Sequence, residues 1–360
     1  MEETDNLLIN SNEIFESQRG ININLNFGDF DIKFFFFGCW NKNIDMTQQI
    51  INKINSDNTI LFGIVNGDNF YPNKYTDADN NTIKEFNLDK IELGFNVLKN
   101  YNKNIYVSLG NHEVDNPIRC ATLITEINNS RDTKINMPTN YYSLSITNNR
   151  GDNMKIIIVD TNLFEKNFCY NENIRNSTKI EMLKWINRII IETPVNIPLI
   201  IVGHYPLFYL KKKKDKPEKF ILNEDTFELY NIIIASNRKI YYLASDIHNY
   251  QEIQHKNIHE FIAGTGGADL DDIENRYRRS EYNIDDNIFS IIETTKNYGY
   301  IKLELCNCKR NILNNFVKIE SSVNDFKLDS GIIESKVGGS YKIKYDKYIY
   351  KINKINKLFM

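Results

Sequence analysis

Residues 60–71 read ILFGIVNGDNFY, a short apolar run that is followed at once by Gly67, Asp68, Asn69 and Tyr71. An apolar run of this length, bounded by a turn signal, is typical of a buried β-strand, and it predicts a strand over residues 60–65. Gly67 lets the backbone turn sharply after the strand and approach an ion or a phosphate closely. We therefore expect this strand to deliver Asp68 to a ligand at one edge of a sheet.

Four other segments repeat this arrangement of a predicted strand followed by polar side chains that can bind metals. They are Gly38-Cys39-Trp40-Asn41, Gly110-Asn111-His112-Glu113, Gly203-His204-Tyr205-Pro206 and Ser245-Asp246-Ile247-His248-Asn249. The carboxyl ends of parallel strands meet at the same edge of a sheet, so these side chains should converge from distant parts of the sequence. Carboxylate, imidazole and amide groups gathered in this way predict a binuclear metal site.

Apolar strand-like segments alternate with amphipathic helical ones along most of the chain. We predict strands at residues 32–37, 60–65, 105–108, 155–159, 199–202, 240–243 and 261–263, and helices at residues 46–54, 88–98, 178–191 and 224–235. This alternation indicates an α/β fold with a mostly parallel sheet. Residues 288–294, 300–305 and 311–319 read as consecutive strands, which suggests a second sheet packed on the first.

Composition and charge exclude several classes of protein. The 360 residues carry a formal net charge of −3, so we expect neither a general affinity for nucleic acid nor one for an anionic membrane. The first residues lack the basic and apolar regions of a secretory signal, and no apolar run is long enough to cross a bilayer. Five cysteines, an odd number, argue for reduced thiols and an intracellular protein.

Four of the segments resemble the motifs of the calcineurin-like metallophosphoesterases. They are residues 67–71, 110–113, 202–207 and 248–251, and residues 137–143, 159–162 and 264–268 support the resemblance, which covers residues 32–305. Within the superfamily the chain looks most like the purple acid phosphatases, because these use a tyrosine three residues after the bridging aspartate as a ligand to ferric iron. Here that tyrosine is Tyr71.

The resemblance implies an α/β fold, a metallophosphoesterase β-sandwich of two mixed sheets flanked by helices. It places the metallophosphoesterase domain at residues 31–320, with an N-terminal extension at residues 1–30 and a C-terminal extension of unassigned role at residues 321–360.

The resemblance also implies the role of each site residue. Asp68 would bridge two metal ions, iron together with zinc, manganese or a second iron; Tyr71 and His248 would complete one site, and Asn111 and His204 the other. A metal-bound hydroxide would attack the phosphorus of a small phosphorylated substrate, a phosphoric monoester. His112 would steady the phosphoryl oxygens or protonate the leaving group.

Two positions depart from the pattern of that family. Cys39 stands where members carry aspartate; its thiolate could bind zinc or iron, or it could be a buried, inert thiol. Asp246 replaces the first histidine of the Gly-His-x-His segment, and on an extended segment it shares a face with His248. The added negative charge should weaken phosphate binding, so we expect reduced or metal-shifted activity.

Two other functions stay open at this stage. A catalytically degenerate scaffold or binding protein is favoured by Cys39 and Asp246, and a phosphodiesterase or nuclease of the same superfamily is disfavoured by Tyr71 and by the lack of a basic groove signature. The lysine run at residues 211–214 could guide an anionic substrate or could be a solvated loop. Glu113 could form a hydrogen bond with a neighbouring ligand residue.

Overall fold

The computed structural model describes residues 20–71, 73–76, 82–85, 88–114, 134–165, 172–213, 216–276, 279–284, 287–306 and 311–318. All of these residues belong to one compact unit, Met1–Ile319. The C-terminal extension predicted from residue 321, and residues 1–19 of the N-terminal extension, lie outside the described residues.

The first of two large sheets has six strands, in the order β19-β18-β2-β3-β6-β7. Their bounds are Asn311–Lys318 (β19), Gly299–Cys306 (β18), Lys33–Phe37 (β2), Phe62–Asn66 (β3), Ile105–Ser108 (β6) and Ile135–Asn136 (β7). Strands β2, β3, β6 and β7 run parallel, whereas β18 is antiparallel to both β2 and β19. The central strands β2 and β3 are continuous apolar runs, as expected of parallel strands that are covered on both faces.

The second sheet has nine strands, in the order β1-β8-β9-β10-β13-β15-β14-β17-β16. Their bounds are Ile21–Asn26 (β1), Tyr142–Thr147 (β8), Asn153–Ile158 (β9), Leu199–Val202 (β10), Ile240–Ala244 (β13), Ile258–Ala263 (β15), Tyr250–His255 (β14), Asn287–Thr295 (β17) and Ser280–Ile284 (β16). Strands β9, β10, β13 and β15 form a parallel block at its centre. Each large sheet therefore contributes a set of parallel strands whose carboxyl ends can carry ligands.

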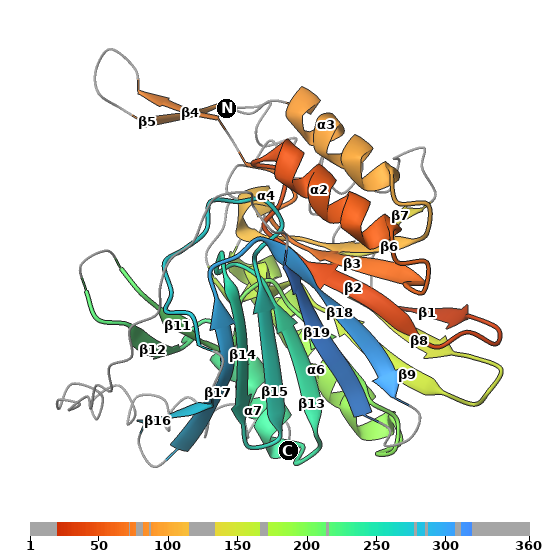
Figure 1. The fold of residues 1–360 in the computed structure, drawn as a ribbon. Helices are drawn as coiled ribbons and strands as arrows, with labels where there is room; N and C mark the ends of the chain where they lie inside the picture. The colour runs from red at the N-terminus through yellow and green to blue at the C-terminus, as the bar shows by residue number, and fades with distance from the viewer. Residues whose placement is uncertain are drawn as a thin grey trace. The chain divides into compact units, whose positions relative to one another are not determined.

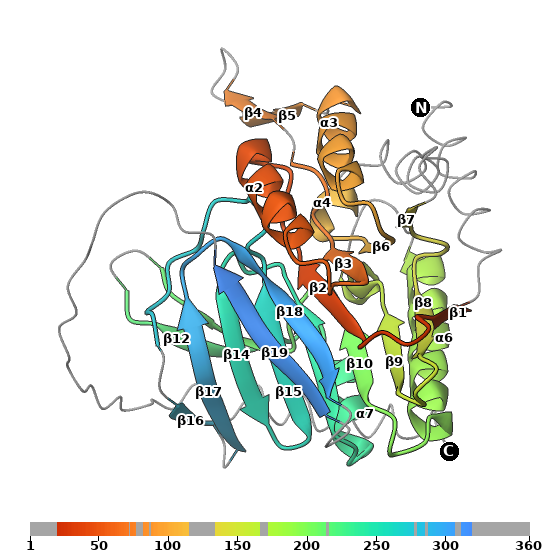
Figure 2. The same ribbon diagram turned by 45° about the vertical axis from the view of Figure 1, so that its right-hand side comes forward.

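Helices connect the parallel strands and cover the sheets (Figures 1 and 2). The longer ones are α2 (Ile44–Asn55), α3 (Leu88–Lys99), α6 (Glu172–Glu192) and α7 (Phe227–Ala235). Two helices are single turns: α4 (Asn111–Val114) and the 3₁₀ helix η1 (Thr161–Phe164). Two hairpins are formed by β4 (Asn73–Thr76) with β5 (Thr82–Glu85) and by β11 (Phe208–Lys211) with β12 (Lys219–Leu222). Helix α2 begins after Asn43, whose side chain accepts the backbone N–H of Met46, and it buries Ile50, Ile51 and Ile54. Its apolar stripe at helical spacing is what holds it on the core.

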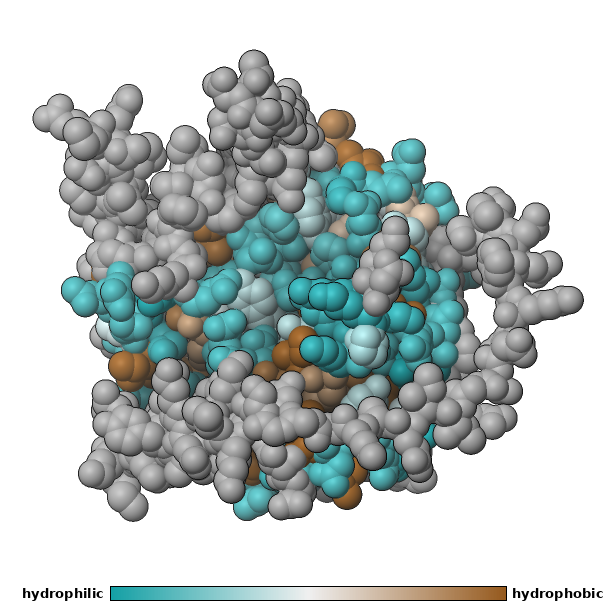
Figure 3. Space-filling model, turned by 90° about the vertical axis from the view of Figure 1, so that its left-hand side faces the viewer, coloured by the Kyte–Doolittle hydropathy of each residue, from teal (hydrophilic) through white to brown (hydrophobic). Residues whose placement is uncertain are grey.

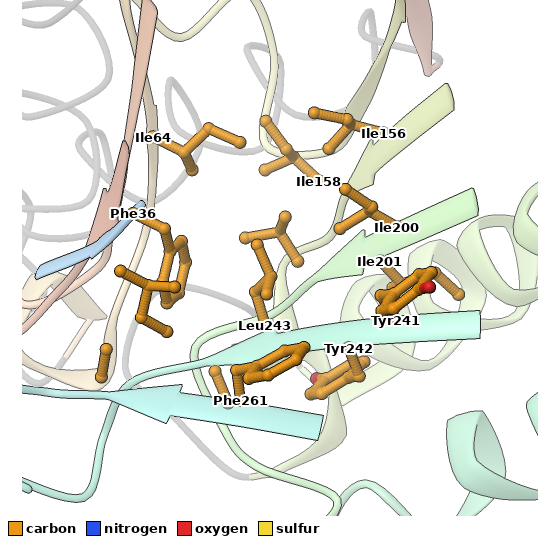
Figure 4. Packing of buried hydrophobic residues seen from close by; sticks show 14 of the residues in the cluster. Phe36, Ile64, Ile156, Ile158, Ile200, Ile201, Tyr241, Tyr242, Leu243 and Phe261 are labelled. Carbon is orange, nitrogen blue, oxygen red and sulfur yellow. The ribbon is translucent and has the colours of Figure 1, made fainter. Parts of the chain in front are cut away.

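The hydrophobic core lies between the two sheets. Figure 4 shows Phe36 of β2 and Ile64 of β3 facing Leu243 of β13, with Phe261 of β15 close by. All four side chains are fully buried and belong to one cluster. Such burial is the main source of stability in a sandwich, and it fixes the two sheets against each other.

The predicted sandwich of two mixed sheets flanked by helices is confirmed, but one detail of its assembly is wrong. We expected residues 288–294, 300–305 and 311–319 to form the second sheet by themselves. Instead β17 pairs with β14 in the nine-stranded sheet, while β18 pairs with β2 in the six-stranded sheet. The chain changes sheets between β17 and β18, and sequence periodicity does not report which sheet a strand joins. Strands β1, β7, β8, β14 and β16 of the two large sheets were not predicted, nor were the hairpins β4–β5 and β11–β12.

Candidate metal centre

Five loops bring the candidate site residues together. These loops follow β2, β3, β6, β10 and β13, so they come from the carboxyl ends of parallel strands in both sheets. Helix α4, which begins the third of these loops, lies at the ends of the strands of both sheets in Figure 1. The convergence predicted from the sequence is therefore observed, with the difference that two sheets supply the loops instead of one.

Asp68 lies at the centre of these loops and is almost completely buried. Its Oδ1 atom is 3.4 Å from Nε2 of His204 and accepts the backbone N–H of His112 at 3.1 Å. Its Oδ2 atom accepts the hydroxyl of Tyr71 at 3.0 Å and lies 3.8 Å from Sγ of Cys39. The two carboxylate oxygens thus face two different groups of side chains.

The group on the Oδ1 side contains Asn111, His204 and Asp246, and we call it the Asp246 half. Nε2 of His204 lies 3.1 Å from Oδ1 of Asn111 and 3.8 Å from Oδ1 of Asp246. His204 is fully buried, so this contact network is shielded from solvent. Asp246 occupies a position from which its carboxylate can join His204 and Asp68 around one ion.

The group on the Oδ2 side contains Cys39, Tyr71 and His248, and we call it the Cys39 half. Ligand atoms of Cys39, Asp68 and His248 all lie within 4.8 Å of one another. Nε2 of His248 is 3.2 Å from the hydroxyl of Tyr71. The other seven residues predicted for the site, including His112, therefore lie around Asp68.

The backbone orients both histidine rings toward Asp68. Nδ1 of His248 lies 2.9 Å from the carbonyl oxygen of Asp269, and Nδ1 of His204 lies 3.2 Å from the carbonyl oxygen of Asn66. Because a carbonyl can only accept, each Nδ1 donates to it, and in a neutral ring Nε2 would be the nitrogen with the lone pair for a metal. This is the arrangement of metal-binding histidines, whose second nitrogen is held by a neighbouring acceptor.

The chemistry of these groups fits a cation. In the Asp246 half, Nε2 of His204 faces carboxylate or amide oxygens of Asp68, Asn111 and Asp246, and with a neutral ring all four atoms would be acceptors. Acceptors crowded in a buried space repel one another unless a positive charge lies between them. The residues present therefore suit a metal ion in this half, and the Cys39 half offers sulfur, nitrogen and oxygen ligands in the same way.

Comparison with known proteins agrees with this geometry. Residues 32–250 match the family model of the calcineurin-like phosphoesterases, which spans more than half of the chain. The chain belongs to the calcineurin-like phosphoesterase family. Proteins of this family are generally metal-dependent phosphoesterases that bind divalent ions. No curated protein matches the chain in sequence.

Several solved structures resemble this calcineurin-like phosphoesterase. GAP50, described as the anchor in the inner membrane complex of Plasmodium, has a TM-score of 0.54 at 14% identity, over 81% of this chain and 85% of that one. PhoD has a TM-score of 0.46 at 11% identity, over 92% of this chain and 78% of that one. A phosphatase from Mycoplasma pneumoniae has a TM-score of 0.39 at 11% identity, over 80% of this chain and 93% of that one. At this identity the likeness to GAP50 concerns the fold alone. Among the described helices, none is long and apolar enough to cross a membrane.

Three residues of the candidate metal centre have strained backbone. Cys39, Asp68 and Asp246 have φ angles of 52°, 50° and 31°, in the left-handed region that residues other than glycine rarely adopt. Aspartate tolerates this region better than most residues, whereas cysteine has no such preference. Strain of this kind persists where the surrounding structure over-determines a conformation, and it gathers at functional sites.

Two glycines are required where the loops touch. A Cβ on Gly67 would collide with Nδ1 of His204, and a Cβ on Gly110 would collide with the backbone nitrogen of Asp68. The φ angle of Gly67 is also positive, at 70°. The glycines that precede Asp68 and Asn111 in the sequence are therefore explained by close packing of the loops.

Sequence reasoning missed a buried polar hub beneath the site. Asn66 donates from Nδ2 to the carbonyl oxygen of Gly203 at 2.9 Å and to Oγ of Ser245 at 2.7 Å, and it accepts from Oγ of Ser108 at 2.6 Å. Its own carbonyl orients His204. Asn66 is the last residue of β3, two positions before Asp68, and that position is the signal that could have identified it.

Glu113 ties two of the loops together. Its carboxylate accepts the backbone N–H groups of Asp68 at 3.0 Å and of Asn69 at 2.8 Å, and also that of Gly110. The hydrogen bond expected between Glu113 and a ligand residue is present, and it is made to the backbone. Burial and the nearby charge of Asp68 raise the pKa of Glu113 to about 7.

Burial and neighbouring charges shift the pKa values of three acidic groups in the site. Burial opposes ionisation of Asp68, but His204, His112 and the backbone N–H of His112 outweigh it and hold the pKa of its carboxyl below the ordinary value. Burial and the charges of Asp68 and Asp246 raise the pKa of the Cys39 thiol well above its usual range. Burial also raises the pKa of Asp246, against the effect of neighbouring cations that include Lys211.

Lys211 and His112 lie at the periphery of the centre. Lys211 ends β11 with an exposed side chain, which fits both interpretations of the lysine run; Lys214 lies outside the described residues. Nε2 of His112 is 3.9 Å from Oδ2 of Asp68, and its ring lies 4.6 Å from that of Tyr71. The His112 side chain is 19% exposed, so solvent or a substrate can reach it.

Proposed function

We propose that this calcineurin-like phosphoesterase is a phosphoric monoester hydrolase of the purple acid phosphatase type, with two metal ions and a small phosphorylated substrate. One observation carries the proposal: the two carboxylate oxygens of Asp68 face two separate sets of ligands. A carboxylate in that position can bridge ions about 3.5–4 Å apart.

Each ion would have four protein ligands. Cys39, Tyr71, His248 and Asp68 would hold one, and Asn111, His204, Asp246 and Asp68 the other. When bound, such ions activate a water molecule near neutral pH and neutralise the phosphoryl oxygens. Iron together with zinc, manganese or a second iron is the pairing that the resemblance implies.

The remaining residues would position the substrate and move a proton. His112 is partly exposed beside Asp68, so its imidazole can reach the leaving-group oxygen of a phosphate placed over the ions. Lys211 approaches from the β11–β12 hairpin with a positive charge that can attract the phosphate. The protein would thus supply orientation, electrostatic attraction and one general acid.

Tyr71 supports the purple acid phosphatase branch. Its hydroxyl reaches both Oδ2 of Asp68, at 3.0 Å, and Nε2 of His248, at 3.2 Å. A phenol between a carboxylate and an imidazole is placed to become a metal ligand. Burial and the charge of Asp68 raise the pKa of this phenol well above its usual range, so only a bound cation would favour the phenolate.

Metal content and turnover of p-nitrophenyl phosphate test this function. We expect the purified protein to bind two ions and to hydrolyse the ester, and Asp68→Asn to reduce both. Asp57→Asn is the matched control, because Asp57 precedes β3 at the opposite end from Asp68 and pairs with Lys302. Hydrolysis that proceeds unchanged in Asp68→Asn, or a protein that binds no metal, would refute the proposal.

A second candidate is a metallophosphoesterase-fold scaffold without activity. It is favoured by the two departures from the family pattern, Cys39 and Asp246. Figure 3 shows one face of the molecule, on which the described hydrophilic residues outweigh the hydrophobic ones. The scaffold predicts no turnover under any metal supplied.

A further inference from the structure

We propose that the two halves of the centre select different ions: the Cys39 half a thiophilic ion of the zinc or cobalt class, and the Asp246 half a harder ion of the manganese or magnesium class. This inference rests on the two-ion site of the proposed function. It concerns the two residues that depart from the family pattern, Cys39 and Asp246, and it gives both departures one explanation.

The Cys39 half is the softer of the two. Cys39 offers sulfur, His248 an imidazole nitrogen, and Tyr71 and Asp68 one oxygen each. Thiolate and imidazole are the ligands that zinc and cobalt bind in preference to magnesium or manganese. Three of the four ligand atoms already lie within 4.8 Å of one another, so little rearrangement is needed to surround an ion.

The Asp246 half contains no sulfur among its ligands. Three of its four donors are oxygens, from Asn111, Asp246 and Asp68, and the fourth is Nε2 of His204. Carboxylate and amide oxygens suit magnesium and manganese. The histidine that the family pattern has at position 246 would make this half more favourable to zinc. The carboxylate of Asp246 instead shifts its metal preference toward magnesium or manganese.

The position of Cys39 argues that its sulfur is a ligand and not core filling. Its backbone N–H donates to the carbonyl oxygen of Gly67, and its carbonyl accepts the N–H of Ala268, so the loop is fixed on both sides. Cys39 lies outside the main hydrophobic cluster and packs instead with Tyr71 and Ala268. The backbone holds this residue at a φ of 52°, in a conformation that favours glycine, asparagine or aspartate over cysteine.

Occupation of the Cys39 half requires loss of the thiol proton of Cys39 and, where Tyr71 binds as the phenolate, loss of its phenol proton as well. The S–H bond breaks, a bond from sulfur to the ion forms, and the proton leaves to the buffer, with no change of oxidation state. The Asp246 half needs no such release from a thiol. Because the Cys39 half offers sulfur and the Asp246 half offers mostly oxygens, the two halves should fill with different ions when both classes are offered together.

Cobalt spectroscopy tests the assignment without reference to turnover. Metal-stripped protein titrated with Co²⁺ should develop a thiolate-to-cobalt charge-transfer band that saturates at one equivalent. Mn²⁺ added next should raise the total metal to two equivalents and give an electron paramagnetic resonance signal of bound manganese. Cys39→Ser and Cys39→Asp should lose the band, and Cys39→Asp should still bind two ions.

Matched variants decide the outcome. The other four cysteines remain in Cys39→Ser, so a band that survives in this variant would overturn the assignment of sulfur to the site. Asp246→His should keep the band but exchange manganese for a second cobalt when both ions are offered; unchanged manganese binding would overturn the selectivity of that half. Circular dichroism checks that each variant is folded. If Cys39→Ser is not folded, Cys39→Asp serves as the variant that lacks the thiol.

The result can be separated from that of the proposed function. Ordered binding of one cobalt and one manganese without hydrolysis of p-nitrophenyl phosphate would leave the selectivity intact and refute the hydrolase. Hydrolysis by a protein that binds two ions without any charge-transfer band would refute the selectivity and leave the hydrolase intact.

Discussion

Oε2 of Glu113 lies 3.0 Å from the backbone nitrogen of Asp68, and this hydrogen bond joins the loop after β6 to the loop after β3. The carboxylate takes two further N–H groups, from Asn69 and Gly110. Glu113 therefore fixes the backbone from which the central carboxylate projects, although its own side chain is directed at the backbone and not at the ligand atoms. It is a positioning residue.

We predict that Glu113→Gln weakens metal binding by roughly 10- to 100-fold, the range found for groups that orient metal ligands. An amide offers one acceptor oxygen where the carboxylate offers two, so at least one of the three N–H groups loses its partner. Metal titration followed by calorimetry measures the change. Glu304→Gln, which removes a carboxylate from a partly exposed ion pair with Lys33, should bind metal like the native protein. Equal affinity in Glu113→Gln would contradict the positioning role.

Asp246 gives a second prediction, about substrate affinity. Replacing it with histidine removes one negative charge from the centre, and we expect KM for p-nitrophenyl phosphate to fall by roughly tenfold. A tenfold change in KM corresponds to about 1.4 kcal/mol. This is less than the interaction energy of two unit charges 4 Å apart near a protein surface, which is about 4 kcal/mol. Steady-state kinetics at saturating metal measure it.

The double variant Cys39→Asp/Asp246→His extends that test. It restores the ligand types of the family pattern, and we expect it to exceed the native chain in turnover. A double variant that is less active than the native protein would show that Cys39 and Asp246 themselves support the reaction, and that the negative charge they add does not reduce it.

The sequence predicted which residues would lie close together better than it predicted which strands would pair. All the predicted site residues lie around Asp68, because short strand-end motifs are local and the topology of parallel strands brings their ends together. The division of β17 and β18 between two sheets was missed, since pairing depends on contacts between distant segments. Asn66 was missed because asparagine at the end of an apolar strand carries no chemical signature until its partners are known.

A third prediction concerns the stability of that hub. Asn66→Ala would leave the carbonyl of Gly203 and the hydroxyls of Ser108 and Ser245 with fewer partners in a fully buried space. Buried polar groups left unpaired cost about 1–3 kcal/mol each, so the free energy of unfolding should fall by at least ~2 kcal/mol. Urea denaturation measures this loss. The control Asn24→Ala, at an exposed site on β1, should change it by less than about 0.5 kcal/mol; equal effects would refute the hub.

The fourth prediction is a pH dependence of stability that arises away from the metal centre. His255 is buried against Phe289, at a ring separation of 4.0 Å, and its nitrogens contact the hydroxyl of Tyr230 and the carbonyl of Ile288. Burial lowers the pKa of its imidazole below the ordinary value of 6.5. The unfolded chain therefore binds a proton at pH values where the folded protein does not. The free energy of unfolding should fall as the pH drops below about 6.5, and the contribution of His255 is fully present above it.

Thermal unfolding between pH 5 and pH 8 measures this slope in the native protein and in His255→Phe. The phenyl ring keeps the stacking on Phe289 but cannot take up a proton, so the variant should lose part of the decline at acid pH even if its stability is lower throughout. His259→Phe is the matched control, because His259 lies on the neighbouring strand β15, outside the stack on Phe289, with its Nε2 2.8 Å from Oε1 of Glu252. Parallel curves for native protein and His255→Phe would show that the acid sensitivity has another origin, since only a group whose affinity for protons changes on unfolding can tilt the curve.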